Sequence, residues 1–299
     1  MRTVKQFTPA LLERFRTERR GSGTHANYIP WHKVTRGEPS SSGRSHLIFW
    51  GGRHRELLSD VEWVAACFAV LTPHLSDLRE QFPLALETAR HELAAYDARF
   101  TSHRAPGTLE LADALKIRHP LVRSEGVSEP WVMSTDFLLT LTSSDGHPTL
   151  LAVACKTGDD LRRRRTMEKL RLEREYWLMR SVPWLLVTPD LFDASAGLTL
   201  RMTTSWLLTE PASTESRGIA AEIALRQAGR PLQAILAEIA SVLGNLRDAQ
   251  CALWQAMWAN ELPIDLRRGW RPHEALEVLT HDDFVALNPI ASRRSAWTS

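Results

Sequence analysis

The sequence contains little cysteine and no long hydrophobic segment. Its three cysteines, Cys67, Cys155 and Cys251, lie far apart, and no two of them form a CxxC pair. This spacing excludes a disulfide framework and a zinc ribbon, and it favours a reducing compartment such as the cytoplasm. The longest unbroken apolar run, from Trp63 to Leu71, is far shorter than the ~20 residues that a membrane helix needs. No apolar segment typical of a secretion signal follows Met1, so we expect no membrane association.

The sequence also lacks the common motifs for phosphate binding, zinc proteolysis and covalent catalysis. It has no GxxxxGK loop, and the glycine pair of residues 21–23 lacks the third glycine of a dinucleotide-binding loop. His91 and Glu92 begin an HExxH zinc motif, but Ala95 occupies the position of its second histidine. No GxSxG nucleophile elbow is present. Any catalytic chemistry must therefore come from another arrangement of residues.

Composition and charge are those of an ordinary globular protein with two domains. The 299 residues exceed the usual ~100–200 residues of one domain. Apolar residues make up 43% and charged residues 24% of the chain, which excludes disordered and fibrous classes. The net charge of +2 does not by itself indicate a nucleic-acid-binding protein. Because residues 191–299 carry 10 basic and 12 acidic residues, the excess of positive charge lies in the preceding part of the chain.

Residues 1–190 combine helix and strand patterns, which predicts an α/β domain. Thr8 and Pro9 supply a helix N-cap and a first-turn proline. A polar turn at 143–146 separates two apolar segments, which predicts a β-hairpin. We expect strands at 132–142, 149–155 and 183–188, and helices that start near residue 8, follow residues 57–62, and cover about 86–100 and 160–180.

Beyond Asp190 the pattern becomes almost wholly helical. Three helices are predicted at about 219–229, 231–243 and 246–259, followed by a short extended segment at 263–266 and a last helix from Pro272. Three helices and a strand of this size are typical of a winged-helix-like module. We therefore predict two domains, at 1–190 and 191–299.

One pair of residues in the predicted hairpin indicates metal-dependent chemistry. Asp136 lies within an apolar strand, where a carboxylate is costly to bury unless it is paired or binds a metal. Lys156 ends the next strand, and strand alternation places residues 154 and 156 on one face, where they can converge with Asp136. An acid and a lysine on neighbouring strands are typical of metal-dependent nucleases. On the pattern alone, an aspartate that caps a strand end and a solvated lysine explain the same residues.

Glu62 is a third candidate with two interpretations. The segment Ser59-Asp60-Val61-Glu62 matches a capping box, in which the Glu62 carboxylate accepts a hydrogen bond from the backbone amide of Ser59. A glutamate at the start of a helix is also available as a metal ligand. The pattern alone favours the cap.

The order of several specific segments resembles TnsA, the endonuclease subunit of heteromeric cut-and-paste transposases. The resemblance covers about residues 25–190 and is much looser over 191–299. The segments are YIPW (28–31), SSGRSH (41–46), LLSDVE (57–62), DLREQFPL (77–84), HP (119–120), VMSTDFL (132–138), EKLRLEREYW (168–177) and PWLLVT (183–188).

The resemblance implies a fold, an activity and a set of partners. It implies that residues 1–190 have a restriction-endonuclease-like fold, a mixed sheet flanked by helices, and that the second domain is winged-helix-like. In that family the subunit cuts the strand that ends 5′ at each transposon end in double-stranded DNA. A TnsB transposase processes the 3′ ends, and the carboxyl-terminal domain engages TnsC, an AAA+ regulator. The near-neutral charge of residues 191–299 suits a protein-binding role.

Carried over by motif, the family's catalytic residues fall on Glu62, Asp136 and Lys156. This sequence departs from the family at Ala154, where a Gln or Glu is expected two residues before the lysine. A methyl group cannot ligate Mg²⁺, so one ligand oxygen is lost. We expect the carboxylates of Glu62 and Asp136 and the backbone carbonyl of Cys155 to hold one Mg²⁺, with Mn²⁺ as a substitute and waters completing the octahedron.

Two alternatives remain open on the sequence alone. Because of Ala154, the chain could be a catalytically silent subunit that bridges the partner transposase and the AAA+ regulator. A stand-alone restriction or repair nuclease of similar fold agrees less well with the helical carboxyl-terminal part. The sequence also leaves open whether Trp31, Arg44 and His46 touch DNA or pack the amino-terminal segment. The same holds for Arg267, Arg268 and Arg271, which could contact phosphate.

Overall fold

The computed structural model describes residues 6–35, 38 and 44–298, which fold into two compact units. The first unit contains Met1–Glu62, His74–Thr188 and Trp297–Ser299, and the second contains Trp63–Pro73 and Pro189–Ala296. The change of unit at Pro189 lies next to the predicted boundary at 190/191. The assignment of Trp63–Pro73 to the second unit was not expected, because these residues follow the candidate Glu62 without a break.

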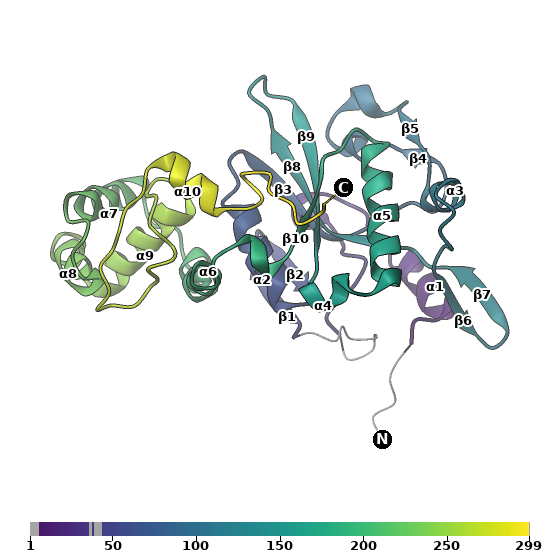
Figure 1. Ribbon diagram of the computed structural model, residues 1–299. Coiled ribbons are helices and arrows are strands. Elements are labelled where there is room, and N and C mark those ends of the chain that lie inside the picture. The colour runs from purple at the N-terminus through teal and green to yellow at the C-terminus, as the bar shows by residue number, and fades with distance from the viewer. Residues whose placement is uncertain (1–5, 36–37, 39–43, 299) are drawn as a thin grey trace. The chain divides into compact units, whose positions relative to one another are not determined.

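The first unit is built on a mixed four-stranded sheet with the order β10-β9-β8-β3 (Figure 1). Strands β3, β8 and β9 are antiparallel neighbours, and β10 runs parallel to β9. The three strands expected from the sequence are present, and the 77–84 segment forms most of the fourth. Their bounds are β3 Leu75–Pro83, β8 Ser134–Thr142, β9 Pro148–Cys155 and β10 Trp184–Val187.

Helix α5, Arg164–Leu178, packs against the sheet (Figure 1). Its buried side includes Leu170 and Trp177, and the Trp177 indole donates a hydrogen bond to Thr135 Oγ1 on β8 at 2.7 Å. The helix is preceded by the single turn of α4, Gly158–Leu161, whose N-cap is Thr157. The single long helix expected over 160–180 is therefore two helices, because the helical conformation is interrupted between Leu161 and Arg164.

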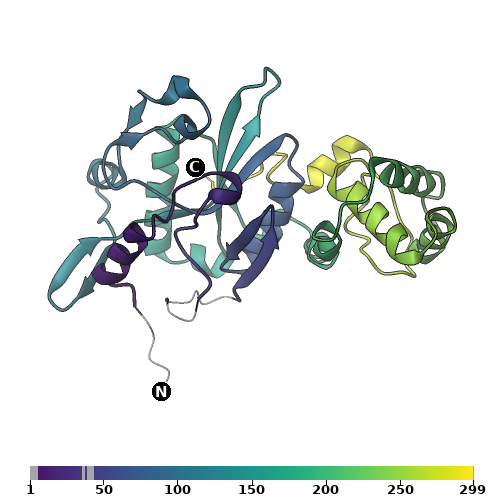
Figure 2. The same ribbon diagram turned by 180° about the vertical axis from the view of Figure 1, so that it is seen from behind.

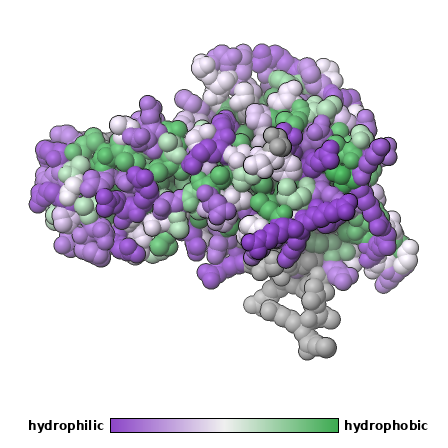
Figure 3. Space-filling model, in the orientation of Figure 1, coloured by the Kyte–Doolittle hydropathy of each residue, from purple (hydrophilic) through white to green (hydrophobic). Residues whose placement is uncertain are grey.

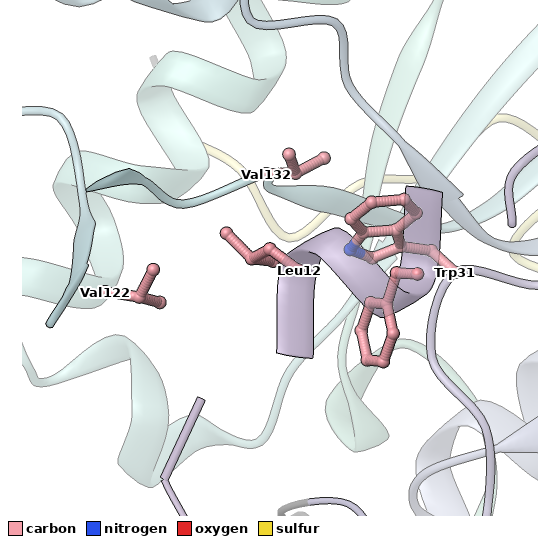
Figure 4. Packing of buried hydrophobic residues seen from close by; sticks show 5 residues of the cluster. Leu12, Trp31, Val122 and Val132 are labelled. Atoms are coloured by element: carbon pink, nitrogen blue, oxygen red, sulfur yellow. The ribbon is translucent and has the colours of Figure 1, made fainter. Parts of the chain in front are cut away.

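Helix α1, Pro9–Thr17, forms as the sequence predicts, with Pro9 in its first turn and Thr8 Oγ1 accepting a hydrogen bond from the Leu11 amide at 3.2 Å. Its apolar side enters a small core with Val122 and Val132 (Figure 4). Trp31 lies in the same core, 4% exposed, with its ring edge-to-face against Phe15. Trp31 is therefore a packing residue and is not placed to contact DNA.

Among its described residues, the first unit also contains three antiparallel two-stranded sheets, of which the β1–β2 hairpin is best seen from behind (Figure 2). The prediction of a helix over 86–100 is wrong. Its place is taken by β4 and two single 3-10 turns, because the side chains of His91 and Asp97 accept hydrogen bonds from amides two residues later and start new turns. The bounds are β1 His46–Trp50, β2 Arg53–Leu57, β4 Ala89–Arg90, β5 Arg104–Ala105, β6 Leu121–Ser124, β7 Val127–Pro130, α3 Thr108–Ala114, and the 3-10 turns His25–Asn27, Glu92–Ala95 and Ala98–Phe100. A further 3-10 turn, Pro189–Leu191, begins the second stretch of the second unit.

Helix α2, Asp60–Val70, contributes to both units, because Glu62 in its first turn belongs to the first unit and Trp63 to the second. Ala65, Phe68 and Ala69 on the remainder of α2 are fully buried. The Phe68 carbonyl accepts a hydrogen bond from the Asn288 side chain within the second unit.

The second unit is helical, and three of its helices lie where the sequence predicts them. The sequence patterns did not predict α6. The last helix, expected from Pro272, begins only at His281 with Thr280 as its N-cap, and residues 275 and 278 form isolated β-bridges with Pro231 and Ile264 instead. The bounds are α6 Ala194–Leu207, α7 Thr214–Arg226, α8 Leu232–Leu243, α9 Leu246–Trp258 and α10 His281–Leu287. Among the described residues, no helix has both the length and the apolar character needed to cross a membrane.

Candidate active site

A pocket of about 480 Å³ collects the three residues that the sequence singles out. It lies where β8 begins and β9 ends, and the first turn of α2 and the first half of α5 form parts of its wall. The polar side chains among its lining residues are His32, Ser59, Glu62, Gln81, Ser134, Asp136, Lys156, Thr157, Asp160, Arg163, Thr166, Lys169 and Glu173.

Asp136 and Lys156 meet in this pocket as the hairpin predicts. The Lys156 ammonium donates hydrogen bonds to Asp136 Oδ2 at 3.0 Å and to the Cys155 carbonyl at 2.7 Å. Asp136 Oδ2 also accepts from the Cys155 backbone amide at 2.6 Å. The Lys156 ammonium and the Cys155 amide thus both donate to Oδ2, so Oδ1 of Asp136 is left for another partner. The buried carboxylate is thus paired, which removes most of the cost of burying its charge.

Glu62 performs the capping role and lines the same pocket. Its Oε2 accepts a hydrogen bond from the Leu58 amide at 2.8 Å, one residue before the amide that the capping-box pattern predicts. The Ser59 hydroxyl donates to Oε1 at 3.2 Å and accepts from the Glu62 amide at 3.1 Å. The two interpretations of Glu62 therefore do not compete, because the carboxylate takes part in the cap of α2 and the side chain also borders the pocket.

Glu173 is a buried acid of the pocket, in addition to Glu62, Asp136 and Asp160, and the sequence reasoning did not identify it. It lies on α5, is 5% exposed, and accepts hydrogen bonds from Thr135 Oγ1 and from the Trp184 indole. A signal was present in the sequence, since Glu173 stands three residues after Leu170 and four before Trp177, on the apolar side of an otherwise charged helix. A glutamate on the buried side of a helix requires a partner or a function.

Burial and repulsion by the Asp136 carboxylate dominate the electrostatics of Glu62 and Glu173. Burial and then the Asp136 carboxylate raise the pKa of Glu62 to about 8. The same two causes raise the pKa of Glu173 to about 7. For Lys156, burial lowers the pKa, but the carboxylates of Asp136, Glu173 and Glu62 outweigh it and raise the pKa. Since burial and the Asp136 charge disfavour the ionised forms of Glu62 and Glu173, an additional cation in the pocket would stabilise those ionised forms.

Two further cations stand at this pocket. Arg163 and Lys169 line it, and the pKa of Lys169 is lowered by burial and by the neighbouring charges of Lys156 and Arg165. Hydrophilic side chains gather over α4 and the beginning of α5 (Figure 3). An anionic ligand would relieve the repulsion among these cations.

Ala154 lies beside Asp136 but does not reach the pocket. Because Phe137 pairs with Val153, the register places Asp136 opposite Ala154, on the strand face that also carries Lys156. Ala154 is fully buried, and its methyl group is not part of the pocket wall. The strand geometry at this position is therefore that expected from the sequence, with the oxygen-bearing side chain missing.

The donors in the pocket fit a small, hard cation through oxygens of several kinds. Over residues 6–35, 38 and 44–298, no three His, Cys, Asp or Glu side chains are grouped so that they could hold a metal ion. Glu62, Asp136 and the backbone carbonyl of Cys155 could supply two carboxylates and one neutral oxygen. Mg²⁺ accepts such a set because it usually binds one or two carboxylates and retains several waters.

The other residues considered for DNA contact have different surroundings. His46 Nε2 lies 2.7 Å from Asp60 Oδ1, so it is engaged within the protein. Arg44 is exposed, whereas Ser41, Ser42 and Gly43 of the same segment lie outside the described residues. In the second unit Arg267 forms an ion pair with Asp265 at 2.8 Å. Arg44, Arg268 and Arg271 are exposed, and none of the ion pairs identified in the described parts of the chain involves them.

Comparison with known proteins identifies the class of this mixed-sheet domain. A family model described as TnsA-like endonuclease N terminal matches residues 73–189, which include β3, β8, β9, β10 and α5. The chain therefore contains a TnsA-like endonuclease domain.

A curated relative extends the match beyond this domain. The transposon Tn7 transposition protein TnsA of Escherichia coli is 34% identical over 214 residues, which cover 70% of this chain and 67% of that protein. The chain belongs to the TnsA family and is a TnsA-type endonuclease subunit of a transposition system.

Proposed function

We propose that this chain is a Mg²⁺-dependent DNA endonuclease that cuts the strand ending 5′ at each transposon end. The observation that carries the proposal is the convergence of Glu62, Asp136 and Lys156 in one pocket, with Lys156 Nζ 3.0 Å from Asp136. Family membership makes a transposition endonuclease the expected activity, and this pocket contains the acids and the lysine that such hydrolysis needs.

Each residue has a distinct role in the proposed reaction. Glu62 and Asp136 would bind the cation through their carboxylates, together with the carbonyl of Cys155. Mg²⁺ supplies charge neutralisation at the scissile phosphate and lowers the pKa of a bound water. Lys156, released from the Cys155 carbonyl, would orient the attacking water or stabilise the charge that develops on the phosphate oxygens. Glu173 would hold Thr135 and keep negative charge near the ammonium.

The exposed arginines beside the pocket support DNA as the substrate. Residues 162–165 are four consecutive arginines, with side chains 84%, 73%, 93% and 41% exposed. Double-stranded DNA presents a regular array of phosphates, to which exposed arginines at the mouth of a catalytic pocket bind favourably.

The second unit would connect the endonuclease to its partners. We propose a winged-helix-like module that engages a TnsC-like AAA+ regulator, while a TnsB-like transposase processes the 3′ ends. The support is its helical character and the near-neutral charge of residues 191–299, which suits protein binding better than DNA binding. The free cysteines and the DNA substrate support a cytoplasmic location.

The test is a cleavage assay on transposon-end DNA with the partner transposase and Mg²⁺. Labelling the 5′-ending and 3′-ending strands separately identifies which strand this chain cuts. We expect 5′-strand cleavage by the wild type and none above background by Asp136→Asn, with 3′-strand processing by the partner unchanged. If the wild type supports assembly and 3′ processing but leaves the 5′ strand intact under all divalent ions, the catalytically silent bridging subunit is the better description.

A further inference from the structure

A glutamine on the neighbouring strand lies in the same row across the sheet as Asp136 and Ala154. Glu80 pairs with Phe137 and Phe82 pairs with Thr135, so the register places Gln81 of β3 opposite Asp136. Ala154 of β9 is opposite Asp136 on its other side. Gln81 and Ala154 therefore flank the same aspartate, one from each neighbouring strand.

Gln81 is enclosed and faces the candidate active site. The residue is 1% exposed and lines the pocket together with Glu62 and Asp136. Its Nε2 donates a hydrogen bond to Glu62 Oε2 at 2.9 Å. Within the part of the chain that the structure describes, we find no hydrogen bond to its Oε1. A half-turn of the amide about its last, soft torsion exchanges Oε1 and Nε2.

The backbone of Gln81 is fixed in a conformation that few residues other than glycine adopt. Its φ is +50°, and its carbonyl accepts a hydrogen bond from the Trp31 amide at 3.1 Å. A non-glycine residue in the left-handed region costs of order 1 kcal/mol or more and persists where the surroundings hold it, often at a functional site. In this backbone conformation the Gln81 amide lies against the carboxylate of Glu62. We attribute this placement to the irregular backbone, because a regular strand geometry does not by itself produce it.

We propose that Gln81 supplies, through Oε1, the neutral ligand oxygen that Ala154 cannot provide in a divalent-cation site shared with Glu62 and Asp136. This inference rests on the proposed function, because it assigns a ligand to the same site. The chain then keeps an amide oxygen next to Asp136, but it comes from β3 instead of β9. The amide orientation that donates its N–H to Glu62 and the orientation that would ligate the cation through Oε1 are related by the same half-turn.

The test measures Mn²⁺ binding to the full chain without DNA, from the free Mn²⁺ signal in electron paramagnetic resonance. Gln81→Met keeps the length of the side chain and removes the oxygen. Since loss of a residue that only supports a metal ligand typically weakens binding 10–100-fold, we expect at least about tenfold weaker binding here. Gln255→Met in the second unit is the matched control, because Gln255 is another buried, hydrogen-bonded glutamine, and it should bind as the wild type does.

Two further variants separate a ligand from a residue that merely positions Glu62. Gln81→Glu keeps the oxygen and loses the N–H donor, so a ligand role predicts Mn²⁺ binding at least as tight as in the wild type. A positioning role predicts the same loss as in Gln81→Met. Adding Ala154→Gln to Gln81→Met should restore most of the lost affinity, because it returns an amide oxygen from the other side of Asp136. Thermal unfolding of each variant checks that it is folded.

Asp136→Asn distinguishes failure of this inference from failure of the proposed function. If Asp136→Asn binds Mn²⁺ as tightly as the wild type, the pocket is not the metal site and both proposals are wrong. If Asp136→Asn loses binding while Gln81→Met retains it, the metal site stands and Gln81 is not its ligand. Failure of Ala154→Gln to rescue Gln81→Met, with Gln81→Glu also weakened, would likewise overturn the ligand assignment.

Discussion

The Lys156 ammonium lies between two oxygens that the proposed metal site would use, Asp136 Oδ2 at 3.0 Å and the Cys155 carbonyl at 2.7 Å. The lysine thus neutralises the aspartate internally. A divalent cation and the ammonium compete for the Cys155 carbonyl, so occupation of the site would release the ammonium from it. The released ammonium would then be available to the reacting phosphate or water.

Lys156→Met is expected to separate cation binding from catalysis. Removing the ammonium takes away a competitor for the same oxygens, so Mn²⁺ binding should be unchanged or tighter than in the wild type. Cleavage of the 5′ strand should fall about 100-fold or more, as is typical when a group that assists proton transfer or charge stabilisation is lost. Titration with Mn²⁺ and single-turnover cleavage measure the two effects. If Mn²⁺ binding and cleavage fell by similar factors, Lys156 would be needed only for the structure of the pocket.

Ala154→Gln is expected to increase cleavage, with the larger gain at low Mg²⁺. The added amide oxygen lies on the strand face of Asp136 and Lys156 and adds a ligand without changing the register. One inner oxygen can contribute up to a few kcal/mol of transition-state stabilisation, or up to about a hundredfold in rate. Cleavage rates measured over a Mg²⁺ series test this, with Ala154→Leu as a control for added bulk. Equal rates for wild type and Ala154→Gln at every Mg²⁺ concentration would remove residue 154 from the ligand positions.

The arginines beside the pocket are expected to bind DNA phosphates. Replacing Arg163 and Arg164 with glutamine should weaken DNA binding similarly for all sequences. It should also reduce the slope of log K against log salt by about 0.9 for each phosphate that the protein no longer neutralises. Fluorescence anisotropy between low and moderate salt measures both. Arg226→Gln is the control, because Arg226 is another exposed, ion-paired arginine, in the second unit. If the Arg163/Arg164 double variant had the same salt slope as this control, the assignment would be contradicted.

His32 is expected to make the protein sensitive to acid. Burial lowers the pKa of His32 to about 4, and Arg20 adds to the effect while Glu38 and Asp136 oppose it. Between pH 6.5 and 4 the unfolded chain therefore binds more protons at this residue than the folded chain. Its contribution to stability is complete above pH 6.5 and declines as the pH falls to 4.

His32→Phe tests this effect, because it keeps a ring against Trp131, on which His32 is stacked. The unfolding free energy of the wild type should fall relative to that of the variant over this range. The full pKa shift would correspond to a difference of about 3 kcal/mol. The measured difference should be smaller, because the His32 side chain keeps some exposure to solvent. Denaturant unfolding at pH 7, 5.5 and 4.5 measures the difference. A constant difference at all three values would show that His32 is protonated equally in both states.

Local patterns predicted the half of the site that a hairpin builds. Asp136 and Lys156 lie on consecutive strands joined by a short turn, so their proximity follows from alternation and register alone. The position of Glu62 followed from the resemblance to a family, because its role as a helix cap gives no information about a distant pocket. Glu173 could not be placed in the site because it reaches the pocket through the packing of α5. Gln81 could not be placed because it reaches the pocket through the pairing of β3 with β8, two strands separated by about 50 residues of chain.

The errors in the fold have the same origin. The charged residues of 86–100 read as a helix, but hydrogen bonds from His91 and Asp97 divide the segment into single turns. The segment after Pro272 reads as the start of a helix, but Ala275 and Val278 are held in β-bridges by residues 44 and 14 positions earlier in the chain. In both cases specific contacts outweigh a weak local preference.

The path of the backbone through α2 determines how this protein can be divided or recombined. The chain passes from one compact unit to the other after Glu62, Pro73, Thr188 and Ala296. Ending the chain at residue 190 would remove Phe192 and Asn288, which contact Phe68, and it would leave the apolar surface of Phe68 in water. A chimera with a relative would have to transplant residues 63–73 together with 189–296. A single fusion point at residue 190 would therefore separate residues 63–73 from the rest of the second unit.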